Sequence, residues 1–430
     1  MQHNFSEFGL SKELVKALDD LQIFIPTEIQ QKAIPILLEQ KTDCIALAKT
    51  GTGKTIAYGL PLLQLIDCNN NDIQAIIISP TRELGHQIFD NLLKFTTYIP
   101  EIKIQSICGG VPIKPQIENL ASSTHIVVAT PGRLLDLMQR KAIDVSKCRF
   151  LILDEADEIA ISHHESLETI LAVLPKDKKN WLFSATMPGV VKQLVQNFMS
   201  HKAIHLSVDM QTIGNLCIDH QFIVVDPIEK LDVLMHFLSS REAERGIIFC
   251  KTKAAVNKLA KNLAIHKFSS GALHGSLTQP IRDRIMAQFR ANQIHLLIAT
   301  DLAARGLDVE ANSFVIHYHL PDVLETYVHR SGRTARAGAK GLSLSILQNE
   351  ERHLIPNFEQ ELGLKFVEYE KPNTSNIEDN KAYLWAKQIF KTKPNTEVSN
   401  EMKQKIKTIF HHLTKDELIE KLIGSIYKKL

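Results

Sequence analysis

The chain alternates short, continuously apolar stretches with longer segments whose apolar residues recur at helical spacing. In the first half, the apolar stretches are Cys44–Leu47, Ala75–Ile78, Ile126–Ala129, Phe150–Leu153 and Trp181–Phe183. A strand that is buried on both faces carries apolar side chains without interruption, whereas a half-exposed strand alternates apolar and polar residues. The repeated order of strand and helix therefore predicts a mostly parallel sheet with helices on both faces.

The same alternation begins again after a polar stretch between Ser207 and Asp219. The second series consists of Phe222–Val225, Ile247–Cys250, Leu296–Ala299, Phe314–Ile316 and the serine-interrupted Leu342–Ile346. We therefore expect an α/β protein with two lobes, at residues 1–205 and 215–365, joined by a linker at 206–214.

Helices are predicted at both ends of the chain. Residues 1–40 indicate two short helices, Ser11–Leu21 and Glu28–Glu39, on either side of Pro26. Residues 370–395 are polar, and from about Asn400 apolar residues recur near helical spacing. We expect residues 370–430 to form a small helical C-terminal extension.

Composition adds a charge asymmetry to this picture. The net charge is +2, and residues 371–430 contain 12 lysines, no arginine and 7 acidic residues, which gives +5 there and −3 for the rest. The extension is therefore a basic appendage on a slightly acidic body. No apolar run is long enough to span a bilayer, and the first residues lack the features of a secretion signal. Six scattered cysteines without a close pair favour a reducing cytoplasm over a disulfide framework or zinc site.

A glycine-rich segment after the first apolar stretch suggests phosphate binding. It consists of Ala48, Lys49, Thr50, Gly51, Thr52, Gly53, Lys54 and Thr55, with Ala48 where the general pattern opens with glycine. Between a strand and a helix, the glycines allow backbone N–H groups to surround an anion, and the helix N-terminus adds positive charge. Lys54 would reach the β- and γ-phosphates, and the Thr55 hydroxyl would hold Mg²⁺. The alternative is a turn that only links strand and helix.

Polar clusters follow most of the other apolar stretches in the first half. Ligands of open α/β sheets bind beyond the carboxyl ends of the strands, so these clusters predict one shared site. In one of them, Asp154 would bind Mg²⁺ and Glu155 would orient and deprotonate the attacking water. The alternative is an acidic loop that caps the next helix.

Two further features suggest nucleotide chemistry. The Gln30 amide can donate and accept at once, as recognition of an adenine edge requires, although a solvated glutamine is the alternative. Arg333 and Arg336 are three residues apart, so both guanidiniums can face a γ-phosphate as arginine fingers. As an isolated pair, they would instead be surface charges.

The ordered motifs resemble those of DEAD-box RNA helicases of superfamily 2, over about residues 5–340. They are IPTEIQ, AKTGTGKT, PTREL, TPGR, DEAD, SAT, IIFC, ATDLAARGLD and HRSGRTARAG. The resemblance implies two RecA-like lobes that close around ATP, Mg²⁺ and single-stranded RNA. It also implies adenine recognition by Gln30 with stacking by Phe5, and ribose contact by Asp308.

The resemblance further assigns coupling and RNA-binding residues. Ser184 and Thr186 would couple hydrolysis to lobe closure, and His329 would join their network. The implied RNA contacts are Pro80, Thr81, Arg82, Gly110, Thr130, Gly132 and Arg133 in the first lobe, and Gln279, Arg282 and Thr300 in the second. Hydroxyls, glycine N–H groups and arginines suit backbone contacts that do not read sequence.

Several positions differ from the usual motifs of the family. Gln22-Ile23 replaces a Gly-aromatic pair, which predicts a looser adenine pocket. Lys49 stands in place of Gln, Gly85 in place of Ala, Ser331 in place of a β-branched apolar residue, and Ala335 in place of Gly. None of these changes removes a charged catalytic group, so we expect activity.

We therefore expect an ATP-dependent RNA helicase that separates short duplexes or remodels RNA–protein complexes. The alternatives are an RNA clamp that does not unwind, and a DNA helicase or nucleotide-dependent switch. The extension weakly resembles the helical dimerisation segment of some bacterial DEAD-box proteins. Its apolar face predicts a homodimer or docking on the second lobe, and its lysines suit nonspecific contact with RNA phosphates.

Overall fold

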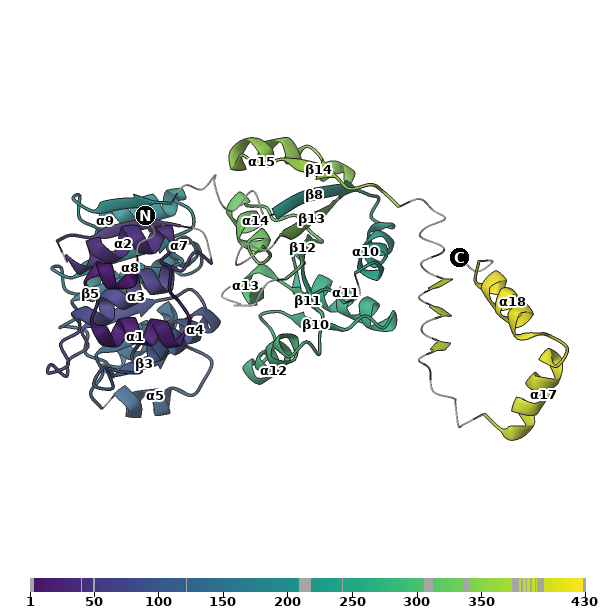
Figure 1. Ribbon diagram of the computed structural model, residues 1–430, viewed down its shortest axis with the longest axis horizontal. Coiled ribbons are helices and arrows are strands. Elements are labelled where there is room, and N and C mark those ends of the chain that lie inside the picture. The colour runs from purple at the N-terminus through teal and green to yellow at the C-terminus, as the bar shows by residue number, and fades with distance from the viewer. Residues whose placement is uncertain are drawn as a thin grey trace. The chain divides into compact units, whose positions relative to one another are not determined.

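The described residues of this computed structural model form two α/β units and a helical tail (Figure 1). The structure describes residues 4–39, 41–48, 51–120, 122–208, 218–241, 243–304, 312–335, 340–372 and 398–427, and within 373–397 residues 379, 382, 383, 385, 386, 389, 390 and 392. One compact unit comprises Met1–Cys217, Ala304–Ala311 and Glu325–Ala339, and the other comprises Ile218–Ala303, Asn312–Leu324 and Lys340–Leu430. None of the described helices is both long and apolar enough to cross a bilayer.

The first unit contains a seven-stranded sheet in which every neighbouring pair is parallel, in the order β3-β4-β2-β5-β6-β1-β7. Its strands are β1 (Cys44–Leu47), β2 (Ala75–Ile78), β3 (Ile104–Ile107), β4 (Ile126–Ala129), β5 (Phe150–Asp154), β6 (Lys179–Ser184) and β7 (Ile204–Ser207). Its helices are η1 (Phe5–Phe8), α1 (Lys12–Asp20), α2 (Glu28–Leu38), α3 (Lys54–Leu65), α4 (Arg82–Phe95), α5 (Ile113–Leu120), α6 (Pro131–Gln139), α7 (Ala156–Ser162), α8 (His164–Val173) and α9 (Gly189–Phe198).

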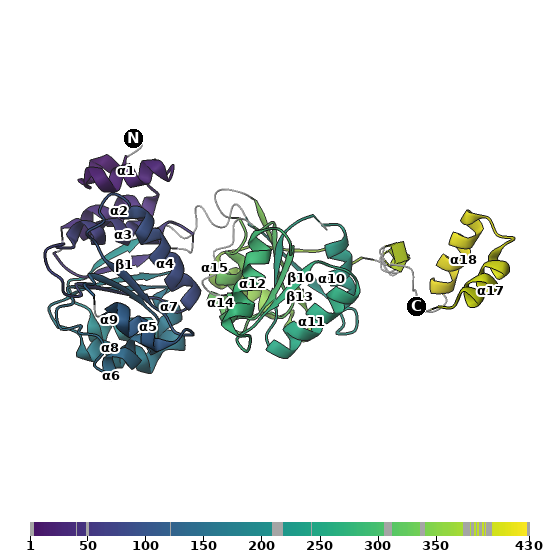
Figure 2. The same cartoon turned by 90° about the horizontal axis from the view of Figure 1, so that it is seen from below.

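Helices cover both faces of this sheet, with α2 and α3 on one side and α8 and α9 on the other (Figure 2). Successive strand residues point to opposite faces, so neighbours along a strand enter different cores. In β2, Ile77 packs with the residues of α1 to α4, whereas Ile76 and Ile78 pack with those of α6 to α9. This double burial explains why the central strands are continuously apolar.

The second unit repeats the architecture, with the parallel order β10-β11-β9-β12-β13-β8-β14. Its strands are β8 (Ile218–Val224), β9 (Gly246–Phe249), β10 (Ser270–Leu273), β11 (Leu296–Ala299), β12 (Phe314–His317), β13 (Gly341–Leu347) and β14 (Phe366–Glu368). Its helices are α10 (Lys230–Ser239), α11 (Lys253–Ile265), α12 (Gln279–Arg290), α13 (Asp301–Ala304), α14 (Leu324–Ser331), η3 (Asn349–Glu351) and α15 (Leu354–Leu362). Residues 325–331 of α14 belong to the first unit by their packing.

The α/β class, the parallel sheets and the C-terminal helices are confirmed. Helix α1 and helix α2 lie within one residue of the predicted bounds. β7 extends to Ser207 and β14 begins at Phe366, so strands continue past the boundaries that we set at 205 and 365. Residues 209–214 of the expected linker lie outside the described residues.

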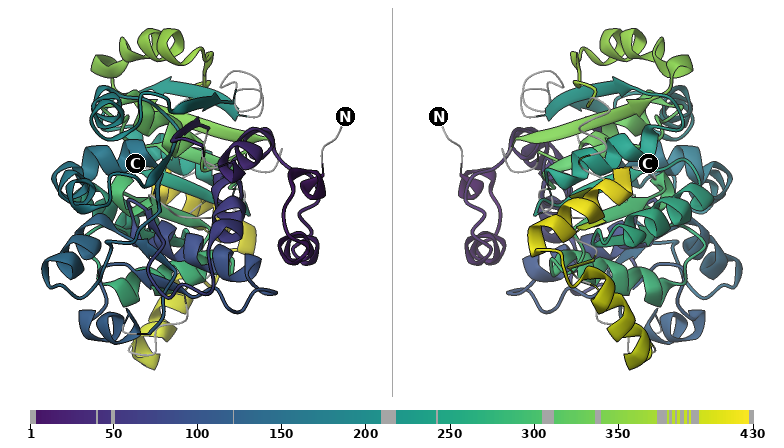
Figure 3. Two further views of the ribbon diagram at one scale, coloured as in Figure 1. Left: turned by 90° about the vertical axis from the view of Figure 1, so that its left-hand side faces the viewer. Right: turned by 90° about the vertical axis from the view of Figure 1, so that its right-hand side faces the viewer.

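The extension contains α17 (Asn400–Phe410) and α18 (Lys415–Tyr427), drawn in yellow in Figure 3. The Ser399 hydroxyl accepts a hydrogen bond from the Met402 N–H and caps α17. Large apolar side chains on both helices are exposed, including Ile409 at 73% and Ile423 at 41%.

Candidate active site and nucleic-acid interface

The glycine-rich segment for which we predict phosphate binding lies between β1 and α3, the strand–helix position that the sequence indicates. Gly51 and Gly53 have φ angles of 85° and 86°, a left-handed conformation that glycine adopts without strain. The Ala48 N–H donates to the Ser184 carbonyl at 2.9 Å, which connects the start of the loop to the end of β6. Lys49 and Thr50 lie outside the described residues.

Two side chains at the start of α2 bind the backbone of this loop. The Thr27 hydroxyl donates to the Thr52 carbonyl at 2.8 Å, and Gln30 Nε2 donates to the Gly53 carbonyl at 3.1 Å. Gln30 Oε1 accepts from the Thr27 N–H at 2.8 Å, and Gln30 is 2% exposed. A Cβ atom at Gly53 would lie 2.2 Å from Gln30 Nε2, so only glycine permits this approach.

Lys54 begins α3 as a buried cation. The residue is 6% exposed, and no described residue accepts a hydrogen bond from its Nζ atom. A buried ammonium group without an acceptor is costly, so this position favours an anionic ligand.

Asp154 ends β5 and is held by two donors. Its Oδ1 accepts from the Glu155 N–H at 3.0 Å, and its Oδ2 accepts from the Tyr58 hydroxyl at 2.9 Å. Burial raises the pKa of Asp154, and the positive charge of Lys54 opposes this shift. Glu155 follows in the left-handed conformation, at φ 53° and ψ 53°, and is buried.

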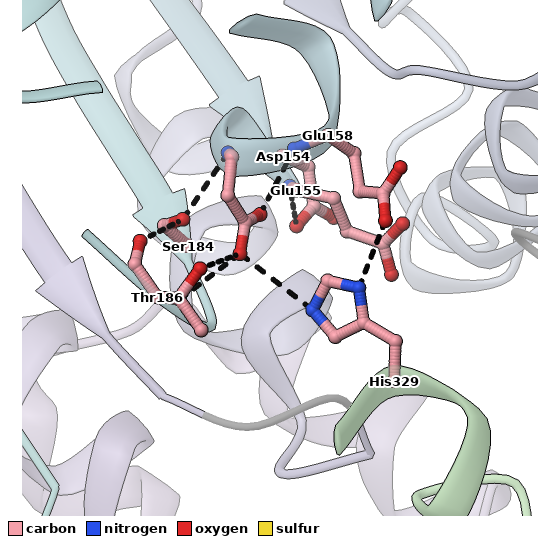
Figure 4. A network of polar contacts seen from close by, with 7 residues as sticks. Asp154, Glu155, Glu158, Ser184, Thr186 and His329 are labelled. Carbon is pink, nitrogen blue, oxygen red and sulfur yellow. Dashed lines mark hydrogen bonds and ion pairs between the residues drawn. The ribbon is translucent and has the colours of Figure 1, made fainter. Parts of the chain in front are cut away.

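A polar network connects the ends of β5 and β6 with α14 (Figure 4). Asp157 Oδ2 accepts from the Thr186 N–H at 3.0 Å and from the Thr186 hydroxyl at 2.8 Å. Ser184 Oγ accepts from the Asp157 N–H at 3.2 Å and donates to the Thr186 carbonyl at 2.7 Å. His329 Nδ1 lies 2.8 Å from Glu158 Oε1, and its Nε2 lies 3.6 Å from Asp157 Oδ2.

The charges in this network favour a protonated histidine. Burial lowers the pKa of His329, but hydrogen bonds and charge from Asp157 and Glu158 outweigh burial and raise the pKa to about 9. Burial raises the pKa of Asp157, but His329, Thr186 and Lys54 together hold it well below its usual range. At neutral pH, therefore, an imidazolium ion faces two carboxylates.

The predicted RNA residues of the first unit lie at the ends of β2, β3 and β4. Thr81 accepts from the Leu84 N–H and caps α4, behind the buried Pro80. The Arg82 guanidinium lies against Gly110, whose φ is 86°, because a Cβ atom there would overlap Arg82 Nη1 at 1.4 Å. The exposed residue Gly132 has open space around its Cα atom.

Helix α5 supports this surface through a glutamine. Arg133 Nη1 donates to Gln116 Oε1, and Arg133 Nη2 donates to the Val111 carbonyl at 2.9 Å. Gln116 Nε2 donates to the Cys108 carbonyl at 3.0 Å, and Thr130 Oγ1 accepts from the Gly109 N–H at 3.2 Å. Side-chain hydrogen bonds therefore join the turn at Gly109 and Gly110 to the start of α6.

The remaining predicted residues come from later in the chain. In the second unit, Gln279 Nε2 donates to Asp283 Oδ1 at 2.9 Å, and Arg282 Nη2 donates to the Ala303 carbonyl at 3.4 Å. Thr300 follows β11, and its N–H donates to the Leu273 carbonyl at 3.2 Å. Arg333 follows α14 and is buried. Asp308 and Arg336 lie outside the described residues.

The position of Phe5 differs from the expectation that its ring stacks on adenine. It is 1% exposed and packs in the core edge-to-face with Phe8, with ring centroids 6.1 Å apart. The structure therefore does not place Phe5 where an adenine ring could stack on it. Stacking needs an open ring face, which a core position removes.

The structure also explains three departures from the family's motifs. Gln22 and Ala335 have φ angles of 58° and 56°, so both occupy a left-handed conformation where the family has glycine. At Gly85, a Cβ atom would lie 2.6 Å from Cys108 Sγ and 2.9 Å from Ser79 Oγ. The absence of a side chain at Gly85 therefore makes room for that thiol.

Sequence reasoning missed Tyr58, Glu158 and Gln116 as members of these networks. Tyr58 is one helical turn after Lys54, and Glu158 follows the DEAD tetrapeptide directly, so their spacing was an available signal. Gln116 lies in a segment without a motif, and only the folded contacts identify it.

The residues present fit a magnesium site that is completed by other ligands. Mg²⁺ prefers oxygen ligands and is usually held by one or two carboxylates together with phosphates and water. Asp154 supplies a buried carboxylate, and burial disfavours its charged form, so a cation bound there would offset this cost. Among the described residues, no three acidic, histidine or cysteine side chains form a metal cage.

Three family models match the chain. The DEAD/DEAH box helicase model matches residues 27–194, and the helicase conserved C-terminal domain matches 229–338. A helical domain described as that of a probable ATP-dependent RNA helicase matches residues 377–427.

Known proteins agree with these models. The ATP-dependent RNA helicase CshA of Listeria monocytogenes is 39% identical over 81% of this chain and 66% of its own length, so the chain spans slightly less than two thirds of that relative. DbpA of Bacillus subtilis, also an ATP-dependent RNA helicase, is 33% identical over 100% of this chain and 89% of its own length. Saccharomyces cerevisiae Dbp5 bound to RNA and ADP-BeF3 has a TM-score of 0.79 at 29% identity, over 89% of this chain and 98% of that one. With its two RecA-like units, this chain belongs to the DEAD-box family of ATP-dependent RNA helicases.

Proposed function

We propose that this protein hydrolyses ATP with Mg²⁺ at the phosphate loop and uses the reaction to separate short RNA duplexes or remodel RNA–protein complexes. Gln30 recognises the adenine edge, and the backbone from Ala48 to Thr55 surrounds the phosphates. RNA binds through its backbone, without a strong preference for sequence.

The buried, unpartnered Nζ atom of Lys54 carries this proposal. Among the described residues, the ammonium group has no acceptor, yet it begins a helix behind two left-handed glycines. Backbone N–H groups, a helix N-terminus and a lysine together suit the negative charge of a β- or γ-phosphate.

The residues at the end of β5 have separate roles in hydrolysis. Asp154 and Thr55 hold the metal, which when bound neutralises charge on the phosphate oxygens. Glu155 orients the attacking water and accepts its proton. Arg333 and Arg336 supply positive charge to the transferred phosphoryl group, and Asp308 contacts the ribose.

Energy limits the extent of unwinding. Breaking a base-pair step costs about 1.4 kcal/mol in DNA, and a similar scale applies to RNA. A single closure of two lobes that bends one strand can disrupt a few steps but not tens. We therefore expect local strand separation without tracking along the duplex.

Two substitutions test the site. Lys54→Ala should weaken binding of a fluorescent ATP analogue or abolish hydrolysis, whereas Lys41→Ala, an exposed lysine with a 75% exposed side chain, should change neither. Glu155→Gln should bind the analogue normally and lose ATP turnover. Wild-type hydrolysis in both site variants would refute the proposal.

The alternative functions require separate assays. An RNA clamp would hydrolyse ATP without displacing a strand, so a displacement assay on a short duplex distinguishes it. Stimulation of ATP hydrolysis by RNA and by DNA of equal length distinguishes a DNA helicase or a switch.

Cellular placement and assembly are further parts of the proposal. Among the described residues, the cysteines form no disulfide bond, which favours a reducing cytoplasm. The exposed apolar residues of α17 and α18 favour pairing with a second copy. Deleting residues 371–430 and measuring the mass in solution tests this homodimer, and an unchanged number of copies per particle argues against it.

A further inference from the structure

The hydroxyl group of Tyr58 binds Asp154, one of the two proposed metal ligands. It donates to Asp154 Oδ2 at 2.9 Å. A phenol has one proton, so this bond uses the only hydrogen that the hydroxyl can donate.

Packing fixes the position of this phenol. Tyr58 is 0% exposed, and its ring contacts Phe183 with centroids 5.1 Å apart. Helix α3 carries Lys54, Thr55 and Tyr58, whereas Asp154 ends β5 and Phe183 belongs to β6. The ring therefore connects the helix of the phosphate loop to the two strands that end at the site.

Two hydrogen bonds set the orientation of the Asp154 carboxylate. The Glu155 N–H binds Oδ1 at 3.0 Å while the phenol binds Oδ2. A carboxylate that is held at both oxygens cannot rotate, and its remaining lone pairs keep a constant direction.

We propose that Tyr58 is a positioning residue for the divalent cation, because its hydroxyl holds the Asp154 carboxylate in the orientation that binds Mg²⁺. This inference rests on the proposed function, which makes Asp154 a metal ligand. Partners of metal ligands commonly change metal affinity by 10- to 100-fold when they are removed.

Tyr58→Phe removes the hydroxyl and keeps the ring. The experiment titrates Mg²⁺ at fixed concentrations of the full-length protein and a fluorescent ADP analogue, and repeats the binding measurement in EDTA. We expect the Mg²⁺ concentration for half-maximal gain in nucleotide affinity to rise about tenfold. Affinity in EDTA should stay unchanged, because the phosphate loop and Gln30 are intact.

Tyr98→Phe is a matched control. The Tyr98 hydroxyl also donates to an aspartate, Asp20, but this contact is exposed to solvent. This variant should have the wild-type Mg²⁺ requirement. Thermal unfolding without nucleotide checks that all variants are folded, since phenylalanine fills the same core space.

Asp154→Asn separates the inference from the function on which it rests. Loss of the Mg²⁺-dependent gain in Asp154→Asn, with a raised requirement in Tyr58→Phe, supports both. Loss in Asp154→Asn with a wild-type requirement in Tyr58→Phe overturns the inference alone. If Asp154→Asn keeps the wild-type Mg²⁺ response, the metal assignment and the inference both fail.

Discussion

His329 Nδ1 lies 2.8 Å from Glu158 Oε1, so α14 meets the residue that directly follows the DEAD tetrapeptide. The pKa of this histidine is about 9, and an unfolded histidine has a pKa of about 6.5. Stabilisation by the ion pair is therefore complete below about pH 6.5 and is lost as the pH rises through about 9. A shift of this size corresponds to roughly 3 kcal/mol.

We expect His329→Gln to lower the free energy of unfolding most at pH 6 and to differ little from wild type above pH 9. Thermal or denaturant unfolding across this range measures the difference. His164→Gln is the control, because His164 faces Glu168 at 3.6 Å on the surface with its side chain 41% exposed. A pH-independent difference for His329→Gln would contradict the ion pair.

Gly85→Ala should be destabilising by about 1–3 kcal/mol, because the new methyl group would overlap Cys108 Sγ at 2.6 Å. Cys108→Ala removes that sulfur atom. In a double-mutant cycle, the combined variant should be more stable than the sum of the single effects predicts. Additive effects would mean that the two positions do not compete for space.

Gly189→Ala is the control for this cycle. No heavy atom lies within 4 Å of the position of its Cβ atom, so this change should leave the unfolding temperature nearly unchanged.

Replacing Gln22 or Ala335, which both have a left-handed backbone, by glycine should stabilise the protein. A non-glycine residue in this conformation costs about 1–2 kcal/mol, so Gln22→Gly and Ala335→Gly should raise the unfolding temperature. Gly363→Ala should do the opposite, because Gly363 has a φ of 60° and no neighbour that a methyl group would meet. Lower unfolding temperatures for both glycine variants would show that side-chain contacts outweigh backbone strain.

Gln116→Leu should weaken RNA binding without reducing ATP hydrolysis in the absence of RNA. The change removes the acceptor of Arg133 and the donor to the Cys108 carbonyl, and we expect roughly tenfold lower affinity for single-stranded RNA. Fluorescence anisotropy measures the affinity. Gln139→Leu, at the exposed end of α6, should bind like wild type. Equal affinities for the two variants would remove Gln116 from the interface.

The sequence predicted the interior strands of both sheets and missed all four edge strands. The missed strands are β3, β7, β10 and β14, which are the outermost members of the two sheets. β3 reads Ile-Gln-Ser-Ile and β7 reads Ile-His-Leu-Ser, so neither is a continuous apolar run. An edge strand has only one neighbouring strand and more contact with water. Its sequence therefore includes polar residues and lacks the continuous apolar run that identified the interior strands.

The motif residues were predictable, but the groups that hold them were not. The spacing of Gly51, Gly53 and Lys54 indicated a phosphate loop by itself. The bond between Tyr58 and Asp154 connects residues 96 positions apart, and the contact between His329 and Glu158 connects residues 171 positions apart. Local patterns contain no information about such pairs, because the fold alone brings them together.

Both polar atoms of the Gln30 amide form hydrogen bonds within the protein: Oε1 accepts from the Thr27 N–H, and Nε2 donates to the Gly53 carbonyl. A purine that binds both amide atoms would replace these two hydrogen bonds with two new ones, and such a replacement gains little net free energy. A base without matching donor and acceptor atoms would break the Gln30 hydrogen bonds and form none in their place. This cost is what would discriminate among bases.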